Sequence, residues 1–73
     1  MQIETLTRMA QQIATNNEGV AEPEAIVRVA THLKSFWTPS MVVELSDYAR
    51  DHADEFDPVV LGALERLHSQ HLG

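Results

Sequence analysis

Hydrophobic and polar positions alternate along most of the chain with the period of an α-helix. Apolar side chains recur every three or four residues, which places them on one face of a helix and the polar side chains on the other. In residues 2–16 this face carries Ile3, Leu6, Met9, Ala10 and Ile13. Comparable faces follow in residues 23–37, 39–52 and 58–70. The pattern therefore predicts four amphipathic helices.

Three prolines mark the expected starts of the last three helices. Pro23, Pro39 and Pro58 each precede a run with helical period, and proline suits the first helical position because its missing N–H is not needed there. Thr38 and Asp57 are favourable N-caps, since a side-chain oxygen can accept an N–H of the first turn. Because Thr38 alone separates the second and third helices, we expect a sharp corner between them.

No strand pattern competes with the helices. The expected fold class is all-α, a small compact array of about four short helices that forms a single domain over residues 1–73. Phe36 and Trp37 end the apolar face of the second helix and are expected to fill the inside of the corner. Gly62 lies inside the fourth helix, either as neutral drift or to allow another helix to approach closely. Three apolar residues off the main faces are candidate partner contacts: Val27, Val43 and Leu61.

The length of the chain limits its stability. A protein of 73 residues buries only about 60% of the surface that its unfolded chain exposes. There is no cysteine, which excludes disulfides, iron–sulfur clusters and thiolate metal sites. Association with itself or with another chain is the remaining means of stabilisation. We see no signal-peptide pattern and no apolar run near the roughly 18 residues of a membrane span, so a cytoplasmic location without membrane contact is expected.

The charge balance is acidic, with eleven Asp and Glu against five Lys and Arg. This argues against nucleic acid as a partner, because binding to phosphates requires clustered positive charge. The acidic residues gather in one segment: Glu44, Asp47, Asp51, Asp54, Glu55 and Asp57. Two interpretations stay open for them. They form a solvated helix face that keeps the protein soluble, or a surface that steers toward a basic patch on a partner.

Residues that could carry chemistry are nearly absent. There is no glycine-rich phosphate loop, HExxH motif or nucleophile elbow, so no catalytic, cofactor-binding or metal-binding residue is predicted. His68 and His71 are three residues apart, but a metal would need further ligands, for which only Glu65 and His52 are nearby options. Structural or incidental roles are therefore expected for these histidines.

Four blocks of residues carry a resemblance to a known family. They are Leu6-Thr7-Arg8-Met9-Ala10, then Gln12-Ile13, then Ala30-x-His32-Leu33-x-x-Phe36-Trp37-x-Pro39-x-Met41, and finally Phe56-Asp57-Pro58-Val59-Val60-x-x-Ala63-Leu64-x-x-Leu67. In order and in spacing, these blocks resemble the delta subunit of NAD-dependent, molybdenum-containing formate dehydrogenases. The chain differs at Thr38 and Ser40, where the family tends to have Asp and Arg.

The resemblance implies a small, cofactor-free accessory subunit without its own active site. In such a complex the catalytic subunit carries a molybdenum–pterin centre and iron–sulfur clusters, and other subunits carry flavin and pass electrons to NAD. The delta subunit would support assembly, stability or cofactor loading of the catalytic molybdopterin subunit. We expect it to contact that subunit through His32, Phe36, Trp37, Pro39, Met41 and Asp57. The alternative is a stand-alone helical interaction module that acts as a homodimer.

Overall fold

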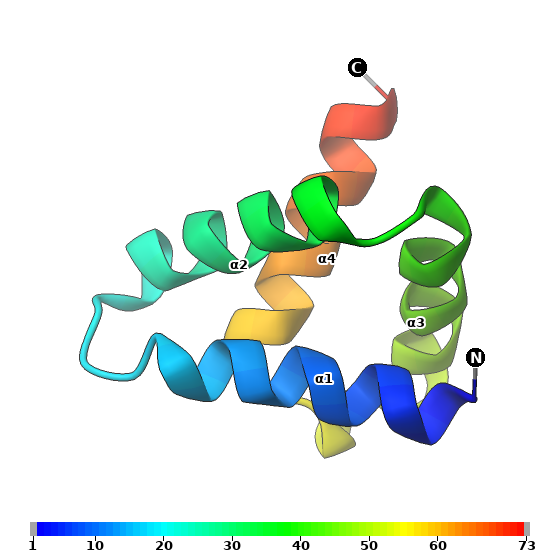
Figure 1. The fold of residues 1–73 in the computed structure, drawn as a ribbon, viewed down its shortest axis with the longest axis horizontal. Coiled ribbons are helices and arrows are strands. Elements are labelled where there is room, and N and C mark those ends of the chain that lie inside the picture. The colour runs from blue at the N-terminus through cyan, green and yellow to red at the C-terminus, as the bar shows by residue number, and fades with distance from the viewer. Residues whose placement is uncertain (1, 73) are drawn as a thin grey trace.

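Four α-helices and one short 3₁₀-helix follow one another along the part of the chain that the structure describes. A computed structural model describes the backbone of residues 2–72 and the side chains of residues 2–69. Its elements are α1 (Ile3–Asn16), α2 (Glu22–Phe36), α3 (Pro39–Asp51), η1 (Ala53–Glu55) and α4 (Pro58–Leu72) (Figure 1). The predicted all-α array of four helices is confirmed. The 3₁₀-helix η1 was not expected from the pattern, and α4 continues two residues beyond its predicted end.

Two of the three predicted helix starts have the expected caps. The hydroxyl of Thr38 accepts a hydrogen bond from the N–H of Met41 at 3.2 Å, and Asp57 Oδ1 accepts one from the N–H of Val59 at 2.9 Å. These bonds satisfy N–H groups that have no partner inside the helix. The start of α2 differs, because Glu22 is already helical and Pro23 takes the second position, with no side-chain cap. Pro39 and Pro58 begin their helices as predicted.

The helices pack around one hydrophobic cluster. In Figure 1, α1 and α2 run in opposite directions from the turn that joins them, α4 crosses behind α2, and α3 stands at the other end of the molecule. The most extensive contact joins α2 to α4, and α4 also contacts α1 and α3. Every α-helix contributes to the largest fully buried side chains, which are Leu6, Val29, Leu33, Leu45 and Val60. The cluster therefore depends on α4 as its central element.

Gly62 allows α2 to approach α4 closely. A Cβ atom at this position would lie 2.6 Å from Cδ1 and 2.9 Å from Cγ1 of Ile26, which is closer than carbon atoms in van der Waals contact. The prediction left neutral drift and close approach open, and the structure supports close approach. Gly19 serves a different purpose, since it takes a φ of 90° in the turn between α1 and α2, where a side chain would be strained.

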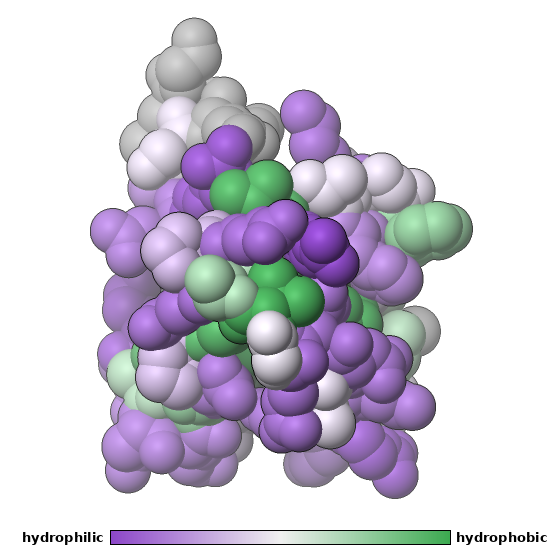
Figure 2. All heavy atoms as spheres, turned by 90° about the vertical axis from the view of Figure 1, so that its left-hand side faces the viewer, coloured by the Kyte–Doolittle hydropathy of each residue, from purple (hydrophilic) through white to green (hydrophobic). Residues whose placement is uncertain are grey.

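The molecular surface combines a polar exterior with a few exposed apolar residues. Figure 2 shows the face over the α1–α2 turn, where hydrophobic atoms gather at the centre and hydrophilic atoms surround them. Val27 and Val43 are exposed as predicted, at 39% and 58%. Leu61 is not, because it is half-buried and packs against the core. Contacts of α4 with three other helices cover more of its surface than one apolar face, which explains the wrong prediction for Leu61.

In the part of the chain that the structure describes, no helix has both the length and the hydropathy to cross a membrane.

Candidate partner-binding site

The corner between α2 and α3 positions five of the six predicted partner-binding residues. After Phe36 ends α2, Trp37 takes an extended conformation, with φ −98° and ψ 147°. This turn directs the indole into the hydrophobic cluster, where Trp37 is only 7% exposed. Thr38 then caps α3. The sequence did not decide whether Trp37 is a core or an interface residue. In the structure, most of the Trp37 side chain lies in the core.

Phe36 lies on the outside of this corner, so the prediction that it fills the inside is wrong. Its side chain is 74% exposed. Its ring faces that of His32 one turn earlier, with the ring centroids 4.7 Å apart and the planes tilted by 37°. The reason is that α2 ends at Phe36, and Trp37 occupies the space inside the corner. Exposed aromatic residues are enriched in protein–protein interfaces, and Phe36 is therefore the most suitable contact residue of the six.

The remaining predicted residues occupy different environments. Pro39 is exposed at the start of α3, and Met41 is half-buried and packs against the cluster. Asp57 directly precedes α4, whose first turn lies away from the corner (Figure 1), and its carboxylate caps that helix. The structure therefore brings His32, Phe36, Trp37, Pro39 and Met41 to one end of α2 and α3, and it does not bring Asp57 to them.

A groove of about 640 Å³ opens beside the corner, between α2, α3 and α4. This volume lies within the range of about 300–1,000 Å³ that is typical of ligand pockets. Its apolar wall consists of Trp37, Pro39, Val42, Val43 and Leu67. Its polar rim consists of Lys34, Ser46, Asp47, Arg50 and His68. The exposed Val43 and the edge of Trp37 thus border the same depression.

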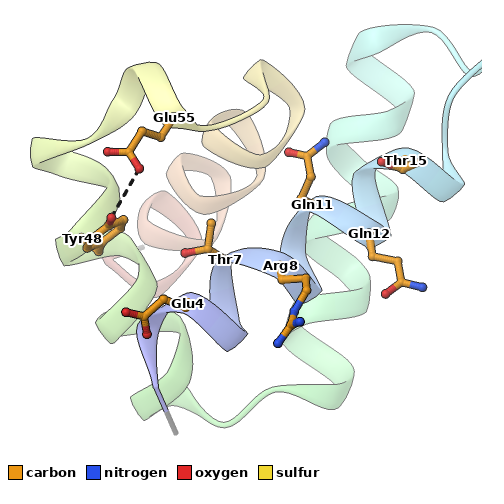
Figure 3. Close-up of a pocket in the computed structure, with 8 residues that line it drawn as sticks. All are labelled: Glu4, Thr7, Arg8, Gln11, Gln12, Thr15, Tyr48 and Glu55. Carbon is orange, nitrogen blue, oxygen red and sulfur yellow. Dashed lines mark hydrogen bonds between the residues drawn. The ribbon is translucent and has the colours of Figure 1, made fainter.

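A second, more open hollow lies between α1 and the η1 segment (Figure 3). Most of its lining comes from polar side chains of α1, with Tyr48 and Glu55 on the other side, and the Tyr48 hydroxyl points toward Glu55. Tyr48 donates a long hydrogen bond of 3.4 Å to Glu55 Oε1. Partial burial raises the pKa of the Tyr48 hydroxyl, because the phenolate would lose hydration. The negative charges of Glu55 and Glu4 raise this pKa further.

Among the described side chains, none of the buried ones is polar or charged. No group of three or more His, Asp or Glu side chains among residues 2–69 could hold a metal ion. His52 contacts the Tyr48 carbonyl through Nδ1 at 3.0 Å and stacks on the Tyr48 ring. His68 is exposed, and the side chain of His71 lies outside the described residues.

Sequence reasoning identified the corner but missed most of the groove. Val42 and Leu67 fall within the predicted amphipathic helices, but their half-buried positions beside Trp37 depend on the angle between α3 and α4. The sequence signals for this surface are Val43, an apolar residue off the main face of its helix, and the predicted contact residues Trp37 and Pro39.

The fold and its surface define a small all-helical protein with an exposed aromatic residue at the end of α2 and an apolar groove between α2, α3 and α4. Residues 5–64 match the family model described as NADH-dependent formate dehydrogenase delta subunit FdsD. The chain belongs to this family, as the four blocks of residues predicted. No curated protein and no solved structure matches the chain.

Proposed function

We propose that this protein is a non-catalytic subunit of a cytoplasmic, molybdenum-dependent formate dehydrogenase. It supports assembly, stability or cofactor loading of the catalytic molybdopterin subunit through direct contact. The observation that carries the proposal is the family match over residues 5–64, which includes the whole corner from His32 to Met41. The exposed Phe36 at that corner supports a role in contact, because burying an aromatic ring against a partner is a strong source of binding free energy.

The contact surface that we propose is the outer side of the corner. His32 and Phe36 form an exposed ring pair on α2, and Pro39 extends this surface onto α3. Trp37 supports the surface from beneath as part of the core. Asp57 contributes by capping α4 rather than by contact at the corner.

Co-purification of the catalytic subunit with tagged variants tests this proposal. Phe36→Ala is expected to weaken the complex, and Val27→Ala is the matched control. Val27 is an exposed apolar residue of the same helix, and nine residues of helix at 100° each place it on the opposite face of α2. Failure of the unaltered chain to retain the catalytic subunit would contradict the proposed function. Equal weakening by both substitutions would contradict the location of the contact surface.

A homodimer remains the second candidate function, favoured by the exposed Phe36 and Val43. Its weakness is the formal net charge of −6, because two copies repel each other. Light scattering of the isolated chain at micromolar concentration separates the two functions. A stable dimer that Phe36→Ala dissociates supports self-association, whereas a monomer supports the subunit function.

A further inference from the structure

The geometry points to the groove between α2, α3 and α4 as the site for an acidic amphipathic segment of the catalytic subunit. Apolar side chains of that segment would lie against Trp37, Val42 and Leu67, and a carboxylate would lie beside Lys34. This inference rests on the proposed function and adds to it the chemistry of the segment that is bound.

The apolar wall of the groove explains why a partner segment would enter it. Val43 is 58% exposed, and Val42 and Leu67 are half-buried. These side chains lie beside the edge of Trp37 and are contiguous within one depression. Covering them removes apolar surface from water, which is the main favourable contribution to association. A wall of aromatic and branched aliphatic residues with a polar rim is also the usual composition of an interface centre.

The charge on the rim selects the chemistry of the segment. The chain as a whole carries more than twice as many acidic as basic residues. In the lining of this groove the ratio of acidic to basic residues reverses, because it contains Lys34 and Arg50 but only one acidic residue, Asp47. Asp47 is also paired with Arg50 at 3.5 Å, whereas Lys34 belongs to neither of the ion pairs between described side chains.

The other hollow provides the contrast. There, Glu4 and Glu55 outnumber Arg8, so the two depressions differ in the sign of their charge. An acidic segment would be attracted to Lys34 and repelled by most of the remaining surface. Complementary charge of this kind favours one orientation and excludes wrong partners. A basic segment would instead be drawn to the acidic side of α3 or to the hollow between α1 and η1.

Site-specific photo-crosslinking identifies what occupies the groove. A benzophenone amino acid replaces Ser46, which lines the groove, and in a matched chain it replaces Gln12, which lines the other hollow. Each chain is assembled with the host's catalytic subunit, irradiated and analysed by mass spectrometry. The expected result is a crosslink from position 46 to a segment of the catalytic subunit that contains both apolar residues and Asp or Glu.

Three outcomes of this experiment would overturn the inference. They are a crosslink from position 46 to a basic segment, a crosslink to a second copy of this chain, and an intact complex in which only position 12 reacts. If the complex does not assemble with either chain or with the unaltered protein, the proposed function fails as well. The two failures are therefore distinguishable.

Charge reversal tests the role of Lys34 directly. Lys34→Glu is compared with Arg66→Glu, which makes the same change in charge at an exposed position of α4 outside the groove. Lys34→Glu is expected to lower the affinity for the catalytic subunit by about tenfold, and added salt should restore part of the loss because it screens the new repulsion. Equal affinities of the two variants, or a loss that salt deepens, would contradict the assigned charge of the segment.

Discussion

At the scale of single residues, the two neighbouring aromatic side chains at the corner between α2 and α3 have opposite environments. Trp37 is 7% exposed and Phe36 is 74% exposed, although both lie on the apolar side of α2 in a helical projection. Angular position alone cannot separate them, because it does not say where the helix ends or how far its neighbours extend along its axis. The extended conformation of Trp37 is a tertiary feature, and it determines which ring enters the core.

Truncation of these two aromatic rings should therefore have unequal effects on stability. Trp37→Ala is expected to lower the free energy of unfolding by about 3–5 kcal/mol, as removal of a buried aromatic ring does. Phe36→Ala is expected to change it by less than about 0.5 kcal/mol, because the ring is on the surface. Urea unfolding followed by circular dichroism measures both, with Leu45→Ala as a fully buried reference. Similar losses for Trp37 and Phe36 would contradict the described corner.

The Tyr48–Glu55 pair predicts a pH effect. Tyr48 is the only tyrosine of the chain, so the ultraviolet absorbance of tyrosinate reports its titration alone. Its pKa should lie above the ordinary value of 10.0, first because of desolvation and then because of Glu55. Glu55→Gln should lower this pKa toward 10.0, whereas Asp54→Asn, beside it in η1, should have little effect.

The sign of the corresponding stability effect follows from linkage. Because the pKa of Tyr48 is higher in the folded than in the unfolded chain, the folded state holds its proton more tightly. The resulting stabilisation is fully present when the pH is below the pKa of Tyr48 in the unfolded chain. It is lost as the pH rises through the pKa of Tyr48 in the folded chain. Unfolding experiments in alkaline buffers should therefore show a loss of stability that is smaller in Glu55→Gln. An equal loss in both proteins would contradict the assignment to this pair.

At the element scale, most of the fold could be predicted from periodicity and capping residues. Thr38, Pro39, Asp57 and Pro58 fixed two helix starts, because their preferences act locally and the structure satisfies them with hydrogen bonds inside the same turn. The errors arose where tertiary contacts decide. Leu61 is half-buried because α4 packs on three sides. The groove depends on the relative positions of three helices, which no local pattern encodes.

Gly62 offers a test of the contact between α2 and α4. Alanine is favoured over glycine in a helix interior by about 1 kcal/mol, but a Cβ atom here would collide with Ile26 at 2.6 Å. Gly62→Ala is therefore expected to be neutral or destabilising in the natural sequence. In an Ile26→Ala background the collision is absent, and the same substitution should stabilise by about 1 kcal/mol.

A double-mutant cycle measured by urea unfolding provides the control for this prediction. The interaction energy between positions 26 and 62 should be clearly different from zero, as expected for residues in contact. Additive effects of the two substitutions would indicate that Gly62 has no packing role. The glycine would then be neutral drift, which was the other sequence-based interpretation.

At the scale of the whole molecule, small size and acidic charge act together. A chain of 73 residues with a net charge of −6 has a limited core and experiences self-repulsion that weakens the compact state. The exposed Phe36 and Val43 add apolar surface that water covers in the isolated chain. A partner that covers the corner and the groove enlarges the core and removes this apolar surface from water, so the folded state should be considerably more stable in the complex.

This coupling leads to a quantitative prediction for thermal unfolding. Free partner at about 100 times its dissociation constant stabilises the folded chain by about 2.7 kcal/mol. Since 1 kcal/mol shifts the unfolding midpoint of a domain of this size by about 4–8 °C, the catalytic subunit should raise the midpoint by roughly 10–20 °C. In the complex, a label on an exposed residue such as Gln12 reports the unfolding midpoint of this chain separately from that of the catalytic subunit.

Concentration dependence separates this stabilisation from self-association. If the chain is a monomer that is stabilised by the catalytic subunit, the midpoint of the isolated chain should not change with its own concentration, and it should rise only when the partner is added. A homodimer would show the reverse, because its stability is inseparable from protomer concentration. Phe36→Ala distinguishes the surfaces involved: it leaves the midpoint of a monomer almost unchanged and removes most of the shift that the partner produces. A shift that survives in Phe36→Ala would place the contact elsewhere on the molecule.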